Sequence, residues 1–249
     1  MNSGLPPQAI SLRWHQEKYA QPGELVPADT QRRVARALAE VEPLAGRSAW
    51  EQRFESAMKS GLLPGGRIMA GAGAGAGAGA KAPARTLMNC LVLPAQDLEG
   101  LLPQLRATLR AGGGVGMDFS GLPRDVMQAL DRCEAVAQSI ERPLRGCRRA
   151  AQMAVLRADH PEIEAFINAP SALHPHMTRA VLVRQEQMSA HLMGLITRAA
   201  WASGEPGLLF ATRLQDDDNL GEHETLSATN PCGEQPLPPH GACALASID

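Results

Sequence analysis

Aromatic side chains are scarce in this sequence, whose 249 residues include three Trp, one Tyr and four Phe. A core must therefore rely on aliphatic residues, and 24 glycines and 19 prolines predict many turns. The net charge of −2 argues against a surface that neutralises many phosphates, so direct nucleic-acid binding is not expected. No apolar run reaches the ~18 residues of a membrane span, and the N-terminus lacks a secretory-signal pattern. We expect a cytoplasmic protein without membrane association.

The cysteines are odd in number and widely spaced, which excludes the disulfide framework of a small secreted module. Because no Cys-x-x-Cys pair occurs, a structural zinc site is not favoured, and no metal site is expected. Surface positions are expected for His174, His176 and His223. The five cysteines are Cys90, Cys133, Cys147, Cys232 and Cys243.

The first sixty residues predict two helices. Asp29 or Thr30 is placed to cap a helix whose apolar face runs to Val41, before Pro43 ends it. A second helix is expected after Ser48, with bulky apolar residues at four-residue spacing, ending at Gly61.

Glycine and alanine alternate without a break from Ala70 to Ala80. Such a run has no bulky side chain to fix a strand register, so we interpret it as a flexible connector. A silk-like strand is the alternative. The chain is thus expected to comprise an N-terminal helical region (1–69), a Gly/Ala-rich linker (70–85) and an α/β region (86–249).

Short apolar runs and amphipathic segments then alternate. This order predicts parallel strands joined by helices, an α/β architecture, followed by a proline-rich loop. Asp97 is expected to cap the first of these helices, and Asp159 with Pro161 to open the third. Strands are expected at 87–93, 115–119, 153–157, 180–183 and 207–210, and helices at 98–112, 126–140, 161–167 and 188–199.

The segment Asn230-Pro231-Cys232-Gly233-Glu234 is the strongest candidate site. The proline and glycine predict a stiff, tight loop with the thiol at its tip. If the stretch is extended, Asn230, Cys232 and Glu234 project to the same side and offer an amide, a thiol and a base to one ligand. The alternative is that Cys232 is a buried packing residue.

Several long stretches, in the same order along the chain, resemble the adenosylcobalamin-dependent (class II) ribonucleotide reductases. They cover nearly the whole sequence. The stretches are SLRWHQEKYA (11–20), LPGGRIMAGAG (63–73), MNCLVLP (88–94), AGGGVGMDFS (111–120), RRAAQMAVLRADHPEIEAFI (148–167), GEPGLLF (204–210) and TNPCGEQPLPPHGACALASID (229–249).

The resemblance implies a role for each residue of the loop. Cys232 matches the thiyl radical that abstracts the ribose 3′ hydrogen, Glu234 the base for the 3′-hydroxyl, and Asn230 the amide that hydrogen-bonds the ribose hydroxyls. Cys90 and Cys243 match the pair that delivers two electrons and becomes a disulfide. Cys133 and Cys147 match no catalytic position, so we expect them to be packing residues.

The resemblance also implies ligands and partners. It suggests an adenosylcobalamin cofactor, a ribonucleotide substrate, a deoxynucleotide effector and a thioredoxin-like reductant, in the supply of deoxyribonucleotides for DNA synthesis. The cofactor-binding residues are not identified. The residues expected to bind substrate or effector are Asn89, Gly114, Gly116, Asp118, Arg148 and Arg149.

The family fold is a ten-stranded α/β barrel behind a helical region, and we expect this chain to hold only its first part. The sequence lacks the Ser-Gly-Pro stretch after Ser120 and part of the barrel after Met188, and it ends at Asp249. Two functions follow as hypotheses. The first is reduction of ribonucleotides, diphosphates being favoured, together with a complementing chain. The alternative is a non-catalytic, truncated paralogue that binds partners.

Overall fold

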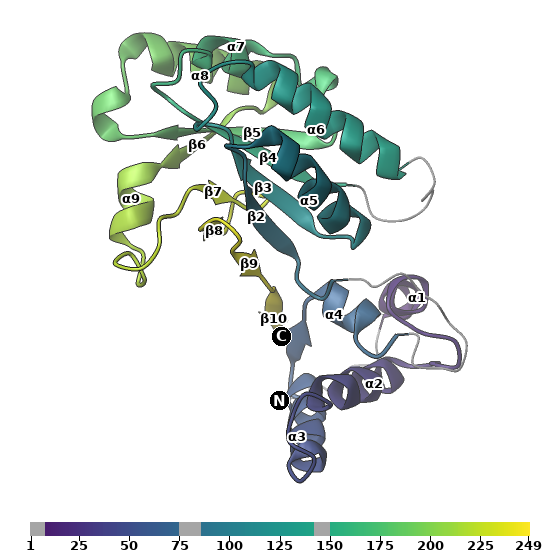
Figure 1. The fold of residues 1–249 in the computed structure, drawn as a ribbon. Coiled ribbons are helices and arrows are strands. Elements are labelled where there is room, and N and C mark those ends of the chain that lie inside the picture. Colours follow the sequence, from purple (N-terminus) through teal and green to yellow (C-terminus); the bar gives the residue numbers. More distant parts are fainter. Residues whose placement is uncertain (1–7, 75–85, 142–149) are drawn as a thin grey trace. The chain divides into compact units, whose positions relative to one another are not determined.

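The computed structural model describes residues 8–74, 86–141 and 150–249 (Figure 1). These residues divide into two compact units. Unit 1 comprises Met1–Asn89 and Ala244–Asp249, and unit 2 comprises Cys90–Cys243. Most of the predicted Gly/Ala-rich linker, residues 75–85, lies outside the described residues, as does the arginine-rich segment 142–149.

Unit 1 is mainly helical. Its second helix begins at Pro27 with Val26 as the N-cap, whereas Asp29 or Thr30 was predicted to cap it. Asp29 lies inside the first turn, where its carboxylate accepts the backbone N–H groups of Leu25 and Val26. The elements are α1 (Ala9–Lys18), α2 (Pro27–Ala39), α3 (Arg47–Lys59), β1 (Leu62–Pro64), α4 (Gly66–Gly71) and β10 (Ala246–Ile248), the last antiparallel to β1.

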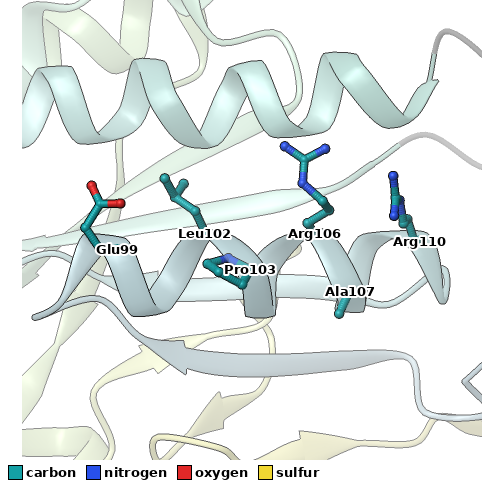
Figure 2. Close-up of a pocket in the computed structure, with 6 residues that line it drawn as sticks. All are labelled: Glu99, Leu102, Pro103, Arg106, Ala107 and Arg110. Atoms are coloured by element: carbon teal, nitrogen blue, oxygen red, sulfur yellow. The ribbon is translucent and has the colours of Figure 1, made fainter.

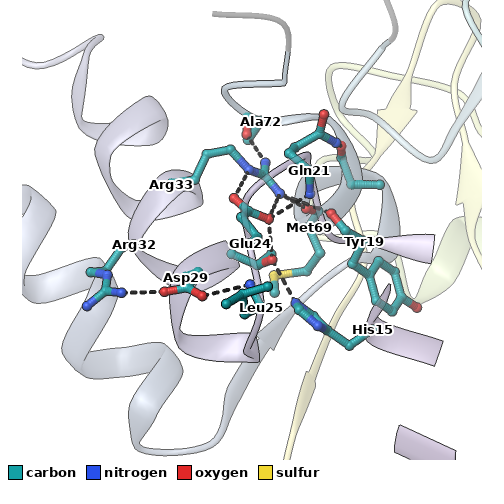
Figure 3. A network of polar contacts seen from close by, with 12 residues as sticks. His15, Tyr19, Gln21, Glu24, Leu25, Asp29, Arg32, Arg33, Met69 and Ala72 are labelled. Atoms are coloured by element: carbon teal, nitrogen blue, oxygen red, sulfur yellow. Dashed lines mark hydrogen bonds and ion pairs between the residues drawn. The ribbon is translucent and has the colours of Figure 1, made fainter. Parts of the chain in front are cut away.

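A network of polar contacts joins the helices of unit 1 (Figure 3). Arg33 of α2 pairs with Glu24 at 2.6 Å, and Thr30 links Glu24 to His15 of α1 through hydrogen bonds of 2.6 and 2.9 Å. Burial alone would raise the pKa of Glu24, but hydrogen bonds from Arg33 and Thr30 lower it overall. The Arg33 guanidinium also donates to the carbonyls of Tyr19, Met69 and Ala72. These contacts anchor α4 and the α1–α2 loop to α2.

Unit 2 is built on a six-stranded sheet with the order β6-β5-β4-β3-β2-β9. Strands β2 to β6 are parallel and β9 is antiparallel to β2, which confirms the predicted α/β alternation. The sheet strands are β2 (Cys90–Pro94), β3 (Gly114–Asp118), β4 (Gln152–Arg157), β5 (Met177–Val183), β6 (Gly207–Phe210) and β9 (Ala242–Cys243). The helices are α5 (Leu98–Arg110), α6 (Val126–Glu141), α7 (Ile163–Asn168), α8 (Ala190–Ser203) and α9 (Ala211–Asp216).

Some sequence predictions for unit 2 were wrong in detail. Helix α7 begins at Ile163 and is not opened by Asp159, because that carboxylate pairs with Arg157 at 3.0 Å instead. The prediction of a proline-rich loop missed α9 and the antiparallel pair β7 (Ala228–Thr229) and β8 (Pro236–Leu237). Asp97 caps α5 as predicted, accepting the backbone N–H of Glu99.

Of the three histidines expected at the surface, His174 is buried in unit 2 and His176 is half-buried. His174 is 2% exposed and bonds Asp131 at 2.9 Å, while His176 contacts the buried Glu134. Both carboxylates belong to α6, so the histidines attach the segment before β5 to this helix. His223 is exposed as predicted.

The two faces of the sheet pack against different partners. Helices α5 to α8 cover one face, and β7 and β8 lie on the other (Figure 1). Val115 and Met117 of β3, and Phe119 directly after it, pack on the helical side in one cluster with Leu105 and Phe166. The opposite face carries a second apolar cluster. Its buried members are Cys90, Val92, Met153, Val155, Ala180, Leu182, Ala228, Leu237 and Cys243.

No helix within residues 8–74, 86–141 and 150–249 combines the length and hydrophobicity that crossing a membrane requires. The same residues contain no cluster of three or more His, Cys, Asp or Glu side chains suited to a metal ion.

Candidate functional site

Two cysteines face each other across neighbouring strands on the face of the sheet away from the helices. Cys90 begins β2, Cys243 ends β9, and the two residues are register partners in the antiparallel pair. Both are buried and both thiols are free. Directly opposed residues of an antiparallel pair have Cβ atoms about 4.5–5.5 Å apart, so a small adjustment brings two such thiols to disulfide distance. The fold thus creates a dithiol from two distant segments.

The pKa of Cys90 depends on burial and on three neighbouring side chains. Burial raises the pKa of the Cys90 thiol to about 11, and the neighbouring Cys243 adds to this rise. Cys232 contributes in the same direction through its charge, whereas the Asn230 carboxamide beside the thiol acts in the opposite direction. Cys90, Cys243, Cys232 and Asn230 therefore form one site, called the cysteine cluster below.

This raised pKa makes the reactivity of Cys90 a test of the cluster. A rise from 9.0 to about 11 lowers the thiolate fraction at neutral pH about 100-fold, so we expect iodoacetamide to alkylate Cys90 about 100-fold more slowly than the ordinary pKa would allow. The rate should rise tenfold per pH unit up to about pH 11. Peptide mass spectrometry measures it at each pH, and the urea-unfolded chain serves as the control. A plateau below pH 9.5 would show that the thiol is not buried as described.

The loop that carries Cys232 is a tight turn with an exposed thiol, as predicted, and the extended conformation considered for residues 230–234 does not occur. The carbonyl of Asn230 accepts the N–H of Gly233 at 3.0 Å, and Gly233 has a φ of +88°, a conformation that suits glycine. The turn leaves Cys232 and Glu234 exposed while Asn230 is 1% exposed. Asn230 and Glu234 are therefore not displayed side by side, as alternate residues of a strand would be.

The Asn230 side chain stabilises this turn through its oxygen and has a buried amide nitrogen as a second polar group. Its side-chain Oδ1 accepts the backbone N–H of Gln235 at 3.0 Å. Its Nδ2 is buried and makes no hydrogen bond of good geometry to any residue in the described part of the chain. A buried amide donor without a partner is unfavourable unless a ligand or water satisfies it. Asn230 is thus equipped to donate to a bound molecule.

Two glycines of β3 let the loop approach the sheet. A Cβ at Gly116 would lie 1.8 Å from the carbonyl oxygen of Thr229, and one at Gly114 would lie 2.9 Å from the Pro231 ring and 3.1 Å from Cys90 Sγ. Both glycines were predicted to bind substrate or effector. The structure gives each a packing role under the loop, because a side chain at either position would displace it.

The other residues expected to bind substrate or effector lie apart from these contacts. Asn89 belongs to unit 1, where its Oδ1 accepts the backbone N–H of Leu245 at 3.4 Å. The Asp118 carboxylate accepts the N–H and hydroxyl of Ser120, and burial raises its pKa. Arg148 and Arg149 lie outside the described residues, as does Cys147. Cys133 is fully buried in the helical-side core, which fits the expected packing role.

Sequence reasoning missed Thr178, the exposed second residue of β5. Its hydroxyl lies 3.0 Å from the carbonyl oxygen of Pro231, the residue before Cys232. No motif marked this position, because a single threonine in a strand is an ordinary residue. The structure alone brings it to the loop.

A surface hollow of about 430 Å³ lies along α5 (Figure 2). Glu99 and Arg106 at its rim contact α6, through an ion pair with Arg132 and a hydrogen bond to Ser139. None of its lining residues belongs to the cysteine cluster. They are Glu99, Leu102, Pro103, Arg106, Ala107 and Arg110.

Comparisons with known proteins agree with this arrangement. The family model described as "Ribonucleotide reductase, barrel domain" matches residues 173–249. A vitamin B12-dependent ribonucleoside-diphosphate reductase of Mycobacterium tuberculosis is 31% identical over 91% of this chain and 38% of its own length. A protein of the same description from Thermoplasma acidophilum is 26% identical over 66% of this chain and 27% of its own length.

A solved structure shares the fold. The Actinobacillus ureae class Id ribonucleotide reductase alpha subunit superposes with a TM-score of 0.71 at 13% identity, covering 97% of this chain and 49% of that one. The chain spans less than two fifths of the length of the curated relatives it matches. Its open six-stranded sheet corresponds to an incomplete barrel.

Proposed function

Because the chain belongs to the ribonucleotide reductase family, we propose that its cysteine cluster reduces ribonucleotides to deoxyribonucleotides by a thiyl-radical mechanism. The observation that carries this proposal is the pairing of Cys90 with Cys243 across β2 and β9, next to the loop of Cys232. Reduction of a ribose needs a two-electron donor and a separate hydrogen-abstracting group, and the cluster contains three thiols. The relatives' names favour ribonucleoside diphosphates as substrates.

The first chemical step belongs to Cys232. Its sulfur, as a thiyl radical, takes the ribose 3′ hydrogen, which leaves a carbon radical at C3′ and a thiol on Cys232. Glu234 accepts the 3′-hydroxyl proton, and the buried Asn230 Nδ2, beside Cys90, donates to a ribose hydroxyl. The exposure of both Cys232 and Glu234 at the turn gives a substrate access to them.

The dithiol completes the reaction. One thiol of Cys90 and Cys243 protonates the departing 2′-hydroxyl, which leaves as water. The pair then supplies two electrons and a hydrogen at C2′ and closes to a disulfide. Glu234 returns its proton to the 3′ oxygen, and Cys232 returns its hydrogen to C3′ and becomes a radical again. The high pKa of Cys90 suits this role, because the thiol stays protonated at neutral pH until a proton is needed.

The relatives' names suggest a cobalamin, which in its adenosyl form supplies radical chemistry when bound. Cys232 fits a cofactor approaching from solvent, because it is exposed while Cys90 and Cys243 are buried. None of the described residues is assigned to hold the corrin ring. We therefore propose that a complementing chain provides the remaining barrel and cofactor surface, and that a thioredoxin-like protein reopens the disulfide. A deoxynucleotide effector is part of the same proposal.

Disulfide formation during turnover tests this function. The reduced full chain is mixed with a ribonucleoside diphosphate and adenosylcobalamin, alone and with a chain carrying the relatives' remaining length, and no external dithiol is added. We expect one Cys90–Cys243 disulfide per deoxynucleotide, quantified by peptide mass spectrometry and chromatography. Cys133→Ala is the matched control, with the same ratio.

Two results would count against the proposal. Product without a Cys90–Cys243 disulfide would assign the electrons to another source. No product in either mixture would favour the alternative, a non-catalytic paralogue that binds partners through the same fold.

A further inference from the structure

The turn that carries Cys232 packs on the sheet mostly through van der Waals contacts, which have no preferred direction. Gly116 and Gly114 leave room for Thr229 and Pro231, and Met153 Cε lies 3.9 Å from the position of a Cβ on Gly233. Van der Waals contacts of this kind set the height of the loop above the sheet but do not fix the rotation of its peptide planes. Some further contact must do so for the thiol to keep one orientation.

We propose that Thr178 is a positioning residue that orients Cys232 by holding the peptide between Pro231 and Cys232, an inference that rests on the proposed function of the thiol. The Thr178 hydroxyl is the only side-chain donor from strands β2 to β6 to residues 229–235 in the described part of the chain. Its acceptor, the Pro231 carbonyl, is rigidly coupled to the N–H of Cys232 because the peptide unit is planar.

The hydroxyl has two other acceptors within reach, but neither is better placed. The Gln152 carbonyl lies at 3.2 Å and the Met153 sulfur at 3.5 Å, compared with 3.0 Å for Pro231. A threonine hydroxyl has one proton to donate, and the carbonyl is a stronger acceptor than a thioether. The bond to Pro231 also links strand β5 to the loop, whereas the others only repeat contacts within the sheet.

The sequence of the loop explains why an outside donor is needed. Pro231 has no N–H. Within the turn, the N–H groups of Gly233 and Gln235 donate to Asn230, and the Asn230 N–H donates to the carbonyl of Gln235. Those bonds close the turn around Asn230 and leave the Pro231–Cys232 peptide unheld by the turn itself. Thr178 supplies the missing contact from β5.

Hydrogen exchange of the loop amides tests this role without requiring any catalytic activity. In the full chain, Thr178→Val removes the hydroxyl at nearly constant shape, and Thr178→Ser retains it. We expect the amides of peptide 229–235 to exchange about fivefold faster in the valine variant and at the wild-type rate in the serine variant. Amides of α6 report global unfolding, and Thr197→Val, on the exposed surface of α8, is the matched control with no effect.

The exchange rates of the two Thr178 variants decide whether the hydroxyl holds the loop. Unchanged exchange in Thr178→Val, or equally fast exchange in Thr178→Ser, overturns the proposal. If α6 also exchanges faster in the valine variant, Thr178→Ala replaces it, because alanine lacks the hydroxyl and does not add the second methyl group of valine. Faster exchange of peptide 229–235 alone in Thr178→Ala supports the proposal, and wild-type exchange there overturns it. Where turnover is measurable, kcat should fall in the valine variant with KM unchanged and recover in the serine variant; unchanged kcat despite a loosened loop overturns the orienting role. Absence of turnover in the wild-type chain would count against the proposed function and leave the exchange result intact.

Discussion

Replacing Cys232 by serine is expected to reduce nucleotide reduction to background, a loss of about a thousandfold or more. Serine matches cysteine in size, but its O–H bond is much stronger than an S–H bond, so the hydroxyl does not become the radical that abstracts the 3′ hydrogen. The side chain is exposed, and the substitution should therefore leave the free energy of unfolding within about 0.5 kcal/mol of wild type. The measurements are deoxynucleotide formation with adenosylcobalamin and a dithiol, and urea denaturation of the same preparation.

A matched control separates this effect from the loss of any thiol. Cys133 lies in the helical-side core, where burial raises its pKa to about 12. Cys133→Ala should cost about 1 kcal/mol of stability and retain turnover, because this thiol lies outside the cysteine cluster. Substantial activity in Cys232→Ser would refute the radical assignment. Equal loss in both variants would point to destabilisation rather than chemistry.

The elements of unit 2 were predictable because their signals are local. Strand β6 at Gly207–Phe210 and the start of α6 at Val126 follow from apolar runs and flanking turn residues. The start of α7 was not predictable, because Asp159 forms an ion pair with the nearby Arg157 and does not cap the helix. Likewise, His174 becomes a core residue through Asp131 of α6, a partner distant in sequence. Periodicity does not report such tertiary pairings.

The candidate site was likewise predictable where its signals are local and unpredictable where it depends on tertiary contacts. The tight loop of Cys232 was predictable from Pro231 and Gly233, but the display of Asn230 and Glu234 on one side was not realised, because the turn buries Asn230 and exposes Glu234. The family resemblance suggested that Cys90 and Cys243 act together, and the register of β2 with β9 provides the physical contact. The packing of Gly114 and Gly116 under the loop could not be predicted, because a glycine in a strand has several uses.

Gly116→Ala is expected to displace the loop of Cys232 and to abolish the function of the cluster with the sheet still folded. The new Cβ would lie 1.8 Å from the Thr229 carbonyl oxygen and 2.9 Å from the carbonyl carbon, and both belong to backbone. No rotamer change relieves such a contact, and β3 is held between β2 and β4. The loop must therefore move by more than an ångström, at an expected cost of about 1–3 kcal/mol in stability. Urea denaturation, hydrogen exchange of residues 229–235 and nucleotide reduction measure the three consequences.

Gly207→Ala is the matched control, since it makes the same substitution in the same sheet. A Cβ at Gly207 would meet its nearest atoms at 3.9 Å, which is ordinary contact, so stability and loop exchange should stay at wild-type values. Wild-type loop exchange in Gly116→Ala would show that β3 is not in contact with the loop. A loss of cooperative unfolding in Gly116→Ala would instead show that the contact between β3 and the loop is part of the folding core of unit 2. In that case the strain would distort β2 and β4 and would not be relieved by movement of the exposed turn.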